Sequence, residues 1–212
     1  MVRDRSEEEV QQEFVDHFPS GAGNLGFNLW KRTVMLHLKW KVYRSLYGES
    51  PEQIDLLNWS APAFFALLGD ILLDDVLLAI ARLIDPSQTG KWENASIGNL
   101  IAILPAEDVA KHSWDTKFNK LTCLSKDIRT LRNKKIAHQD LKQALRYHDD
   151  PLPGISRAYV EEVLKDTRVL LGDIENEYLG TRNTTEHFLP PIGGVDKLIY
   201  LLEEARKNSG LK

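Results

Sequence analysis

The stretch APAFFALLGDILLDDVLLAIARLI, residues 61–84, is the most apolar part of the chain and decides its fold. Ser60 and Pro62 have the residue types that begin a helix, and Asp85-Pro86 has those that end one. Between them, apolar side chains surround the helix axis almost completely. A helix with this pattern is expected at the centre of a bundle, where every face is covered.

Charged side chains within this stretch argue against a membrane span. They are Asp70, Asp74, Asp75 and Arg82. At the centre of a bilayer each of these charges would cost about 2.5 to 3.5 kcal/mol. The pattern therefore predicts a buried helix of a soluble protein, and no membrane partner is expected.

Helical signals dominate the rest of the chain, whereas the alternation of apolar and polar residues typical of strands is nearly absent. Ser6 and Glu9 have the spacing of a capping box, and Ser50 and Ser156 are further candidate caps. We expect helices over about 6–18, 24–47, 51–57, 62–84, 97–104, 106–147 (with at most one interruption), 156–179 and 195–207. The sequence thus predicts an all-α bundle.

Length and composition favour a single domain. The chain has 212 residues, of which 42% are hydrophobic and 27% charged, so it can bury a sizeable core without disulfide or metal links. We expect one domain over 1–212, with a core at about 24–180 and a loop and C-terminal helix in 181–212. The single cysteine, Cys123, and a charged N-terminal stretch without a leader pattern point to the cytoplasm. Because Cys123 lies beside the apolar Leu121 and Leu124, it is expected to be a buried packing residue.

Positive charge is concentrated in one segment of an otherwise acidic chain. The net charge is −4, yet residues 117–146 contain nine Lys or Arg against two Asp, which is +7 and leaves −11 for the remainder. Such a segment is a candidate surface for an anionic ligand, because concentrated positive charge attracts phosphate groups. The alternative is a solvated helix face balanced by acidic neighbours.

The sequence Arg132-Asn133-Lys134-Lys135-Ile136-Ala137-His138-Gln139-Asp140 lies inside this segment. An Arg followed after four to six residues by His, with a polar residue after the Arg and Ala before the His, resembles the signature of the HEPN superfamily. The upstream run Ala81-Arg82-Leu83-Ile84-Asp85-Pro86 is similar to the abortive-infection U-type (AbiU2-like) branch. The resemblance extends over roughly residues 30–179 and implies a HEPN-like helical bundle.

This resemblance implies a metal-independent endoribonuclease that acts as a homodimer, as a toxin or antiphage effector, without a cofactor. Its catalytic pair would be Arg132 and His138, with Asn133 in the supporting polar position. RNA cleavage would leave a 2′,3′-cyclic phosphate. An antitoxin or regulatory protein is a further expected partner. HEPN toxins that a nucleotidyltransferase controls carry a Tyr two residues after the His, and Asp140 stands there, so neutralisation by modification of that Tyr is not expected.

The residue types also suit this chemistry on their own terms. His138 can give or take a proton near neutral pH, and Arg132 can hold the phosphoryl oxygens with a permanent charge and a planar fork of donors. The residues expected to position the RNA backbone are Lys126, Arg129, Lys134 and Lys135.

The spacing of Arg132 and His138 constrains the site. In a regular helix, six residues separate the two side chains by about 120° around the axis, so they do not share a face. Either the helix is interrupted between them, or the same segment of a two-fold partner completes the site. A purely structural His138, bonded to a carboxylate such as Asp74 or Asp85, is the alternative. The candidate supporting acids are Asp74, Asp85 and Asp140.

Two other functions remain open on the sequence. The first is a non-catalytic helical module that uses the same basic segment to bind nucleic acid, a nucleotide or a protein. The second is a metal-dependent enzyme built on Asp70, Asp74 and Asp75, but no His or further carboxylate has a supporting spacing. Ion pairs of these acids with Arg132 or Arg82 are the favoured explanation for them.

Overall fold

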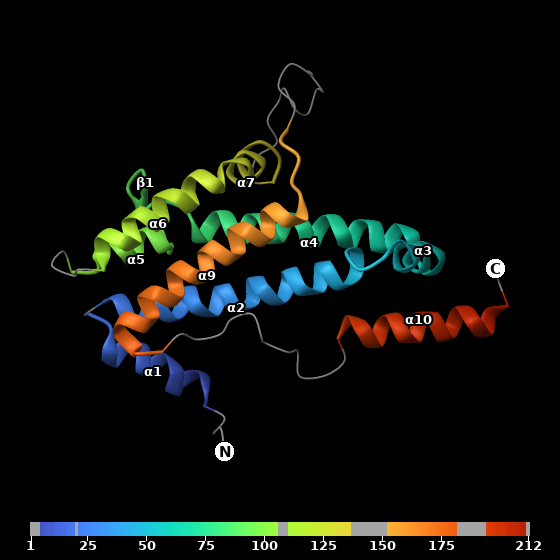
Figure 1. The fold of residues 1–212 in the computed structure, drawn as a ribbon, viewed down its shortest axis with the longest axis horizontal. Coiled ribbons are helices and arrows are strands. Elements are labelled where there is room, and N and C mark those ends of the chain that lie inside the picture. Colours follow the sequence, from blue (N-terminus) through green and yellow to red (C-terminus); the bar gives the residue numbers. More distant parts are fainter. Residues whose placement is uncertain (1–4, 20, 106–109, 137–151, 182–193, 211–212) are drawn as a thin grey trace. The chain divides into compact units, whose positions relative to one another are not determined.

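The computed structural model describes residues 5–19, 21–105, 110–136, 152–181 and 194–210, and helices dominate these ranges (Figure 1). The helices are α1 (Glu7–His17), α2 (Ala22–Tyr47), α3 (Pro51–Ser60), α4 (Pro62–Leu83), α5 (Ile97–Ile103), α6 (Lys111–Leu124), α7 (Lys126–Leu131), the π-helical turn η1 (Arg132–Ile136), α9 (Arg157–Leu179) and α10 (Val195–Ser209). The predicted all-α class is confirmed. None of the helices in the described ranges has the length and apolar character needed to cross a bilayer.

Serine caps begin several of these helices. Ser6 caps α1 in a complete capping box with Glu9, and the side chains of Ser50, Ser96 and Ser156 accept bonds from backbone N–H groups in the first turns of α3, α5 and α9. Each bond satisfies a donor that the helix itself leaves unpaired. The starts of these four helices can therefore be recognised from the local sequence.

A short antiparallel pair of strands occupies part of the loop expected after α4. β1 (Gln88–Thr89) pairs with β2 (Trp92–Glu93), and Gly90 in the turn has a positive φ of 61°. Glycine adopts this backbone conformation without the steric cost that a side chain imposes. The pair is too short to produce a detectable alternation in the sequence.

The chain divides into two compact units, and α2 and α4 each contribute residues to both. The first unit comprises Met1–Thr33 and Leu77–Thr185. Its core includes an aromatic group in which Phe14 stacks on Phe18 and meets Phe27 edge-on, and α6 packs along α9. In the second unit, Val34–Val76 and Glu186–Lys212, α10 packs against α3 around a small core of Leu46, Leu57 and Phe65.

The burial of α4 differs from the expectation of a helix covered on all sides. Val76, Leu77 and Ile80 in its second half are at most 2% exposed, as predicted. In its first half, however, Phe64, Leu67 and Ile71 are 60%, 61% and 55% exposed. These residues follow one another at intervals of three and four, so they form one uncovered stripe. Hydrophobicity alone did not reveal which side of α4 has a neighbour.

The segment expected to be helical over 106–147, with at most one interruption, is broken at Ser125 within the part that the structure describes. α6 ends at Leu124, where the phenol of Tyr159 donates a hydrogen bond to the Leu124 carbonyl oxygen. Ser125 separates α6 from α7, and α7 continues directly into η1. Burial raises the pKa of Tyr159, with the charge of Asp127 as a further cause. A tertiary contact with α9 thus lies at the C-terminal end of α6, and local sequence could not show it.

Candidate nucleic-acid site

Arg132 is the first residue of η1, so the helix changes from α to π geometry at the residue expected to bind phosphate. π-Helical turns are rare and frequently occur at functional sites. They also change the angular spacing of the side chains that follow. The change of helical geometry begins at Arg132, whereas the part of the chain between Ile136 and His138 lies outside the described residues. His138 and Asp140 lie outside the described residues.

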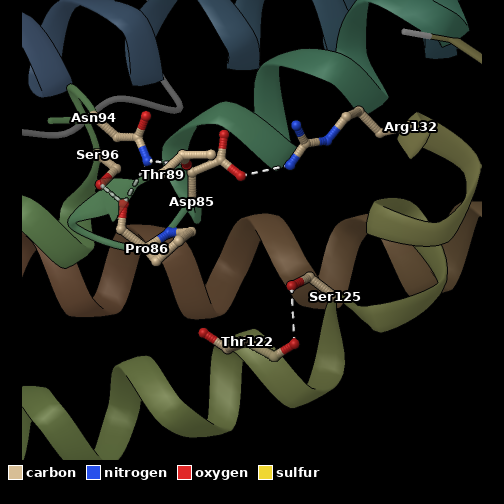
Figure 2. A network of polar contacts seen from close by, with 8 residues as sticks. All are labelled: Asp85, Pro86, Thr89, Asn94, Ser96, Thr122, Ser125 and Arg132. Carbon is tan, nitrogen blue, oxygen red and sulfur yellow. Dashed lines mark hydrogen bonds and ion pairs between the residues drawn. The ribbon is translucent and has the colours of Figure 1, made fainter. Parts of the chain in front are cut away.

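Asp85 holds the Arg132 side chain. Figure 2 shows the guanidinium reaching the Asp85 carboxylate, with Nη2 at 2.6 Å from Oδ1. The two side chains are only 25% and 16% exposed, so water screens the pair weakly. A charge-assisted hydrogen bond of this length orients the planar fork. The predicted role of Asp85 as a supporting acid is consistent with this geometry.

The remaining donors of Arg132 are unused within the described part of the chain. Its Nε is buried and has no hydrogen-bond partner there, and only Nη2 donates to a described residue. A buried donor without a partner costs free energy. A guanidinium has five N–H donors, so the bond to Asp85 leaves capacity for a further acceptor.

The loop after Asp85 is held by polar side chains that sequence reasoning missed. The Nδ2 of Asn94 donates to the Pro86 carbonyl at 2.9 Å and to the Thr89 hydroxyl at 2.8 Å, and the Ser96 hydroxyl donates to the same carbonyl at 3.2 Å (Figure 2). Ser96 is fully buried and also caps α5. As an N-cap serine, Ser96 could have been recognised from the sequence, whereas no local signal identified Asn94.

Gly98 allows the first turn of α5 to approach the backbone of Asp85. A Cβ atom at position 98 would lie 3.0 Å from the Asp85 carbonyl oxygen and 2.9 Å from Cζ of Phe118. Both distances are shorter than ordinary van der Waals contact. Position 98 therefore requires glycine for packing, and this packing fixes the residue that orients Arg132.

The structure separates the basic residues at 117–136, the described part of the segment, into two groups. Lys117 and Lys120 on α6 form ion pairs with Asp173 and Asp166 on α9, so for these two the alternative of a balanced helix face is correct. The residues expected to contact RNA lie at the other end of the segment. Lys126 and Arg129 lie on α7, and Asn133, Lys134 and Lys135 follow Arg132 in η1; Lys126, Asn133 and Lys135 are exposed.

Asp75 of α4 does not pair as the sequence predicted. It pairs with Lys39 at 2.7 Å, so the expectation that it pairs with Arg132 or Arg82 is wrong. Within the described ranges, no three His, Cys, Asp or Glu side chains come together in the manner of a metal site. Cys123 is exposed rather than buried, because Leu121 and Ile128 occupy the inward positions instead.

The described ranges are mostly helical, and the basic motif begins with Arg132-Asn133 in η1. The comparison with known families agrees, since the family described as AbiU2, a HEPN family, matches residues 27–198. The chain therefore belongs to the AbiU2 family of HEPN proteins. No curated protein and no solved structure matches it.

The first prediction concerns the strength of the Arg132–Asp85 pair. In a double-mutant cycle with Arg132→Gln and Asp85→Asn, we expect a coupling free energy of about 1 to 2 kcal/mol, because the pair is charge-assisted and shielded from water. The exposed pair of Lys120 and Asp166, replaced by Gln and Asn, should couple by less than about 1 kcal/mol. Urea unfolding of the single and double variants measures both coupling free energies. Equal values would contradict the expectation that the Arg132–Asp85 pair is the stronger because it is shielded from water.

The second prediction concerns Gly98. Replacement by Ala would gain up to about 1 kcal/mol of helix propensity, but the clash with the Asp85 carbonyl and Phe118 would cost about 1 to 3 kcal/mol. We therefore expect Gly98→Ala to lower the free energy of unfolding by about 1 kcal/mol. Gly154→Ala is the matched control, since a Cβ there meets nothing within 4 Å. If Gly98→Ala instead raises the free energy of unfolding, position 98 has room for a Cβ beside the Asp85 carbonyl and Phe118.

Proposed function

We propose that this protein is a metal-independent endoribonuclease that acts in the cytoplasm as a toxin or antiphage effector. The observation that supports this most is the Arg132 guanidinium, which Asp85 orients at the start of the π turn and which keeps donors unused within the described residues. Membership of the AbiU2 family makes an abortive-infection module of the RNase type the coarser expectation. Asp85 is then a positioning residue for Arg132.

In the proposed reaction, the 2′-hydroxyl oxygen attacks the adjacent phosphorus, the new O2′–P bond forms and the P–O5′ bond breaks. The proton of the 2′-hydroxyl passes to a base and the departing O5′ receives one, and His138 serves in this proton transfer. Arg132 binds the phosphoryl oxygens as negative charge develops on them, with Asn133 beside it. The products are a 2′,3′-cyclic phosphate and a 5′-hydroxyl, and no cofactor is needed.

The basic residues around Arg132 supply the binding surface. Lys126 and Arg129 on α7 and Lys134 and Lys135 in η1 continue the positive charge on both sides of Arg132. Contacts of this kind hold the RNA backbone without reading its sequence. An antitoxin or regulatory protein would be expected to cover the same surface.

The third prediction is a cleavage test. We expect the wild-type protein to cut mixed RNA in the presence of EDTA, and Arg132→Ala and His138→Ala each to reduce the rate at least about 100-fold. Lys165→Gln, an exposed change on α9, is the control and should cleave normally. Unfolding curves must show that all variants are folded.

Two outcomes would overturn parts of this proposal. If the wild type binds RNA but cuts none, the chain is the non-catalytic binding module and not an enzyme. If EDTA abolishes cleavage, the metal-free mechanism is wrong.

The fourth prediction tests the proposed homodimer, in which the site combines Arg132 of one copy with His138 of the other. When the inactive Arg132→Ala and His138→Ala proteins are mixed and allowed to exchange, each mixed dimer contains one intact site, and about a quarter of the wild-type activity should return. If both residues act within one copy, mixing restores nothing. A monomer in light scattering would also contradict the shared site.

A further inference from the structure

Arginines from three different elements lie near the loop that begins at Asp85. Arg132 contributes the ion pair from η1, and Arg82 precedes Asp85 by three residues in the last turn of α4. The third is Arg32 of α2, whose Nη1 donates to the Ala95 carbonyl at 2.5 Å. Ala95 is the neighbour of Ser96, which anchors the loop after Asp85. All these residues belong to the first compact unit.

The electrostatics of Arg32 show that these side chains share one environment. Burial lowers the pKa of Arg32, the charge of Arg82 lowers it further, and Asp85 acts in the opposite direction. Arg82 and Asp85 are therefore close enough to Arg32 for their charges to be felt.

The group carries more positive than negative charge. Among the described residues, Asp85 is the only acid that forms an ion pair with any of the three arginines. Arg82 is exposed and forms no hydrogen bond or ion pair with the described part of the chain, and Nε of Arg132 is buried without a partner there. Three guanidinium groups against one carboxylate leave an excess of two positive charges, which repel one another until an anion binds.

We propose that Arg82 and Arg32, together with Arg132, form a binding site for a second backbone phosphate of single-stranded RNA, beside the phosphate that is cleaved. This inference rests on the proposed function, because it assigns RNA as the source of the phosphate. Guanidinium groups suit this ligand, since their paired donors match phosphate oxygens. The exposed Arg82 receives the strand, whereas Arg32 is half-buried and held by the Ala95 carbonyl. Arg132 is shared by the two phosphates.

A purely structural role for Arg82 makes a different prediction. The C-terminal end of a helix stabilises a positive side chain, and Arg82 lies in the last turn of α4. In that case replacement of Arg82 would lower stability and leave RNA binding unchanged. Measuring binding and unfolding on the same variants separates the two roles.

The fifth prediction uses a 2′-O-methyl RNA oligomer, which cannot be cleaved because its 2′-oxygen is blocked. By fluorescence anisotropy with the full chain, we expect Arg82→Gln to raise the Kd about five- to tenfold and to reduce the salt slope of log K by about 0.7, the value for one phosphate contact on a single strand. Lys165→Gln removes one exposed charge on α9 and is the matched control, with a Kd within about twofold of wild type. Asp85→Asn should bind more tightly at low salt, because it removes the only acid among the described residues that forms an ion pair with these arginines.

The possible results distinguish failure of the second phosphate site from failure of the proposed endoribonuclease activity. If Arg82→Gln and Lys165→Gln bind RNA equally well, or if AMP binds as tightly as the oligomer, the second phosphate site is wrong even where cleavage is normal. If Arg82 governs binding but the wild type cuts no RNA, the phosphate site stands and the enzyme does not. If the wild type binds no RNA, both are overturned.

Discussion

The ion pair between Arg132 and Asp85 is the constraint on which the candidate site depends. It joins residues 47 apart in the sequence, one at the end of α4 and the other at the start of η1. The loop after Asp85 is fixed in turn by Asn94 and Ser96, and its backbone is packed against Gly98. The direction of the Arg132 guanidinium is therefore set by rigid neighbours, which is what electrostatic stabilisation of a phosphoryl group requires.

The distribution of charge follows from the same packing. The basic segment looked uniform in the sequence, but Lys117 and Lys120 pair with acids of α9 and help to hold α6 on α9. Beyond the break at Ser125, α7 and η1 carry the remaining basic residues of the described segment. Two of the basic residues thus stabilise the packing of α6 on α9, whereas the others lie on the elements next to Arg132.

Most helix ends were predictable, because caps, prolines and apolar spacing act within a few residues. Ser6, Ser50 and Ser156 begin helices as expected. Features that depend on distant residues were not predicted. The exposure of Phe64 depends on which faces of α4 are covered by other residues, and the bond from Tyr159 of α9 to the end of α6 joins residues 35 apart. Neither feature can be recognised from the local pattern.

By itself, the sequence determined the helical class, the basic segment and the motif that begins at Arg132, since these depend on residue type and spacing along the chain. Only the tertiary structure decided which acid meets that arginine. The sequence favoured Asp70, Asp74 or Asp75 for an ion pair with Arg132 or Arg82, yet Arg132 pairs with Asp85 and Asp75 pairs with Lys39. The physical reason is that an ion pair forms between groups that packing brings within a few ångströms, whatever their separation in sequence.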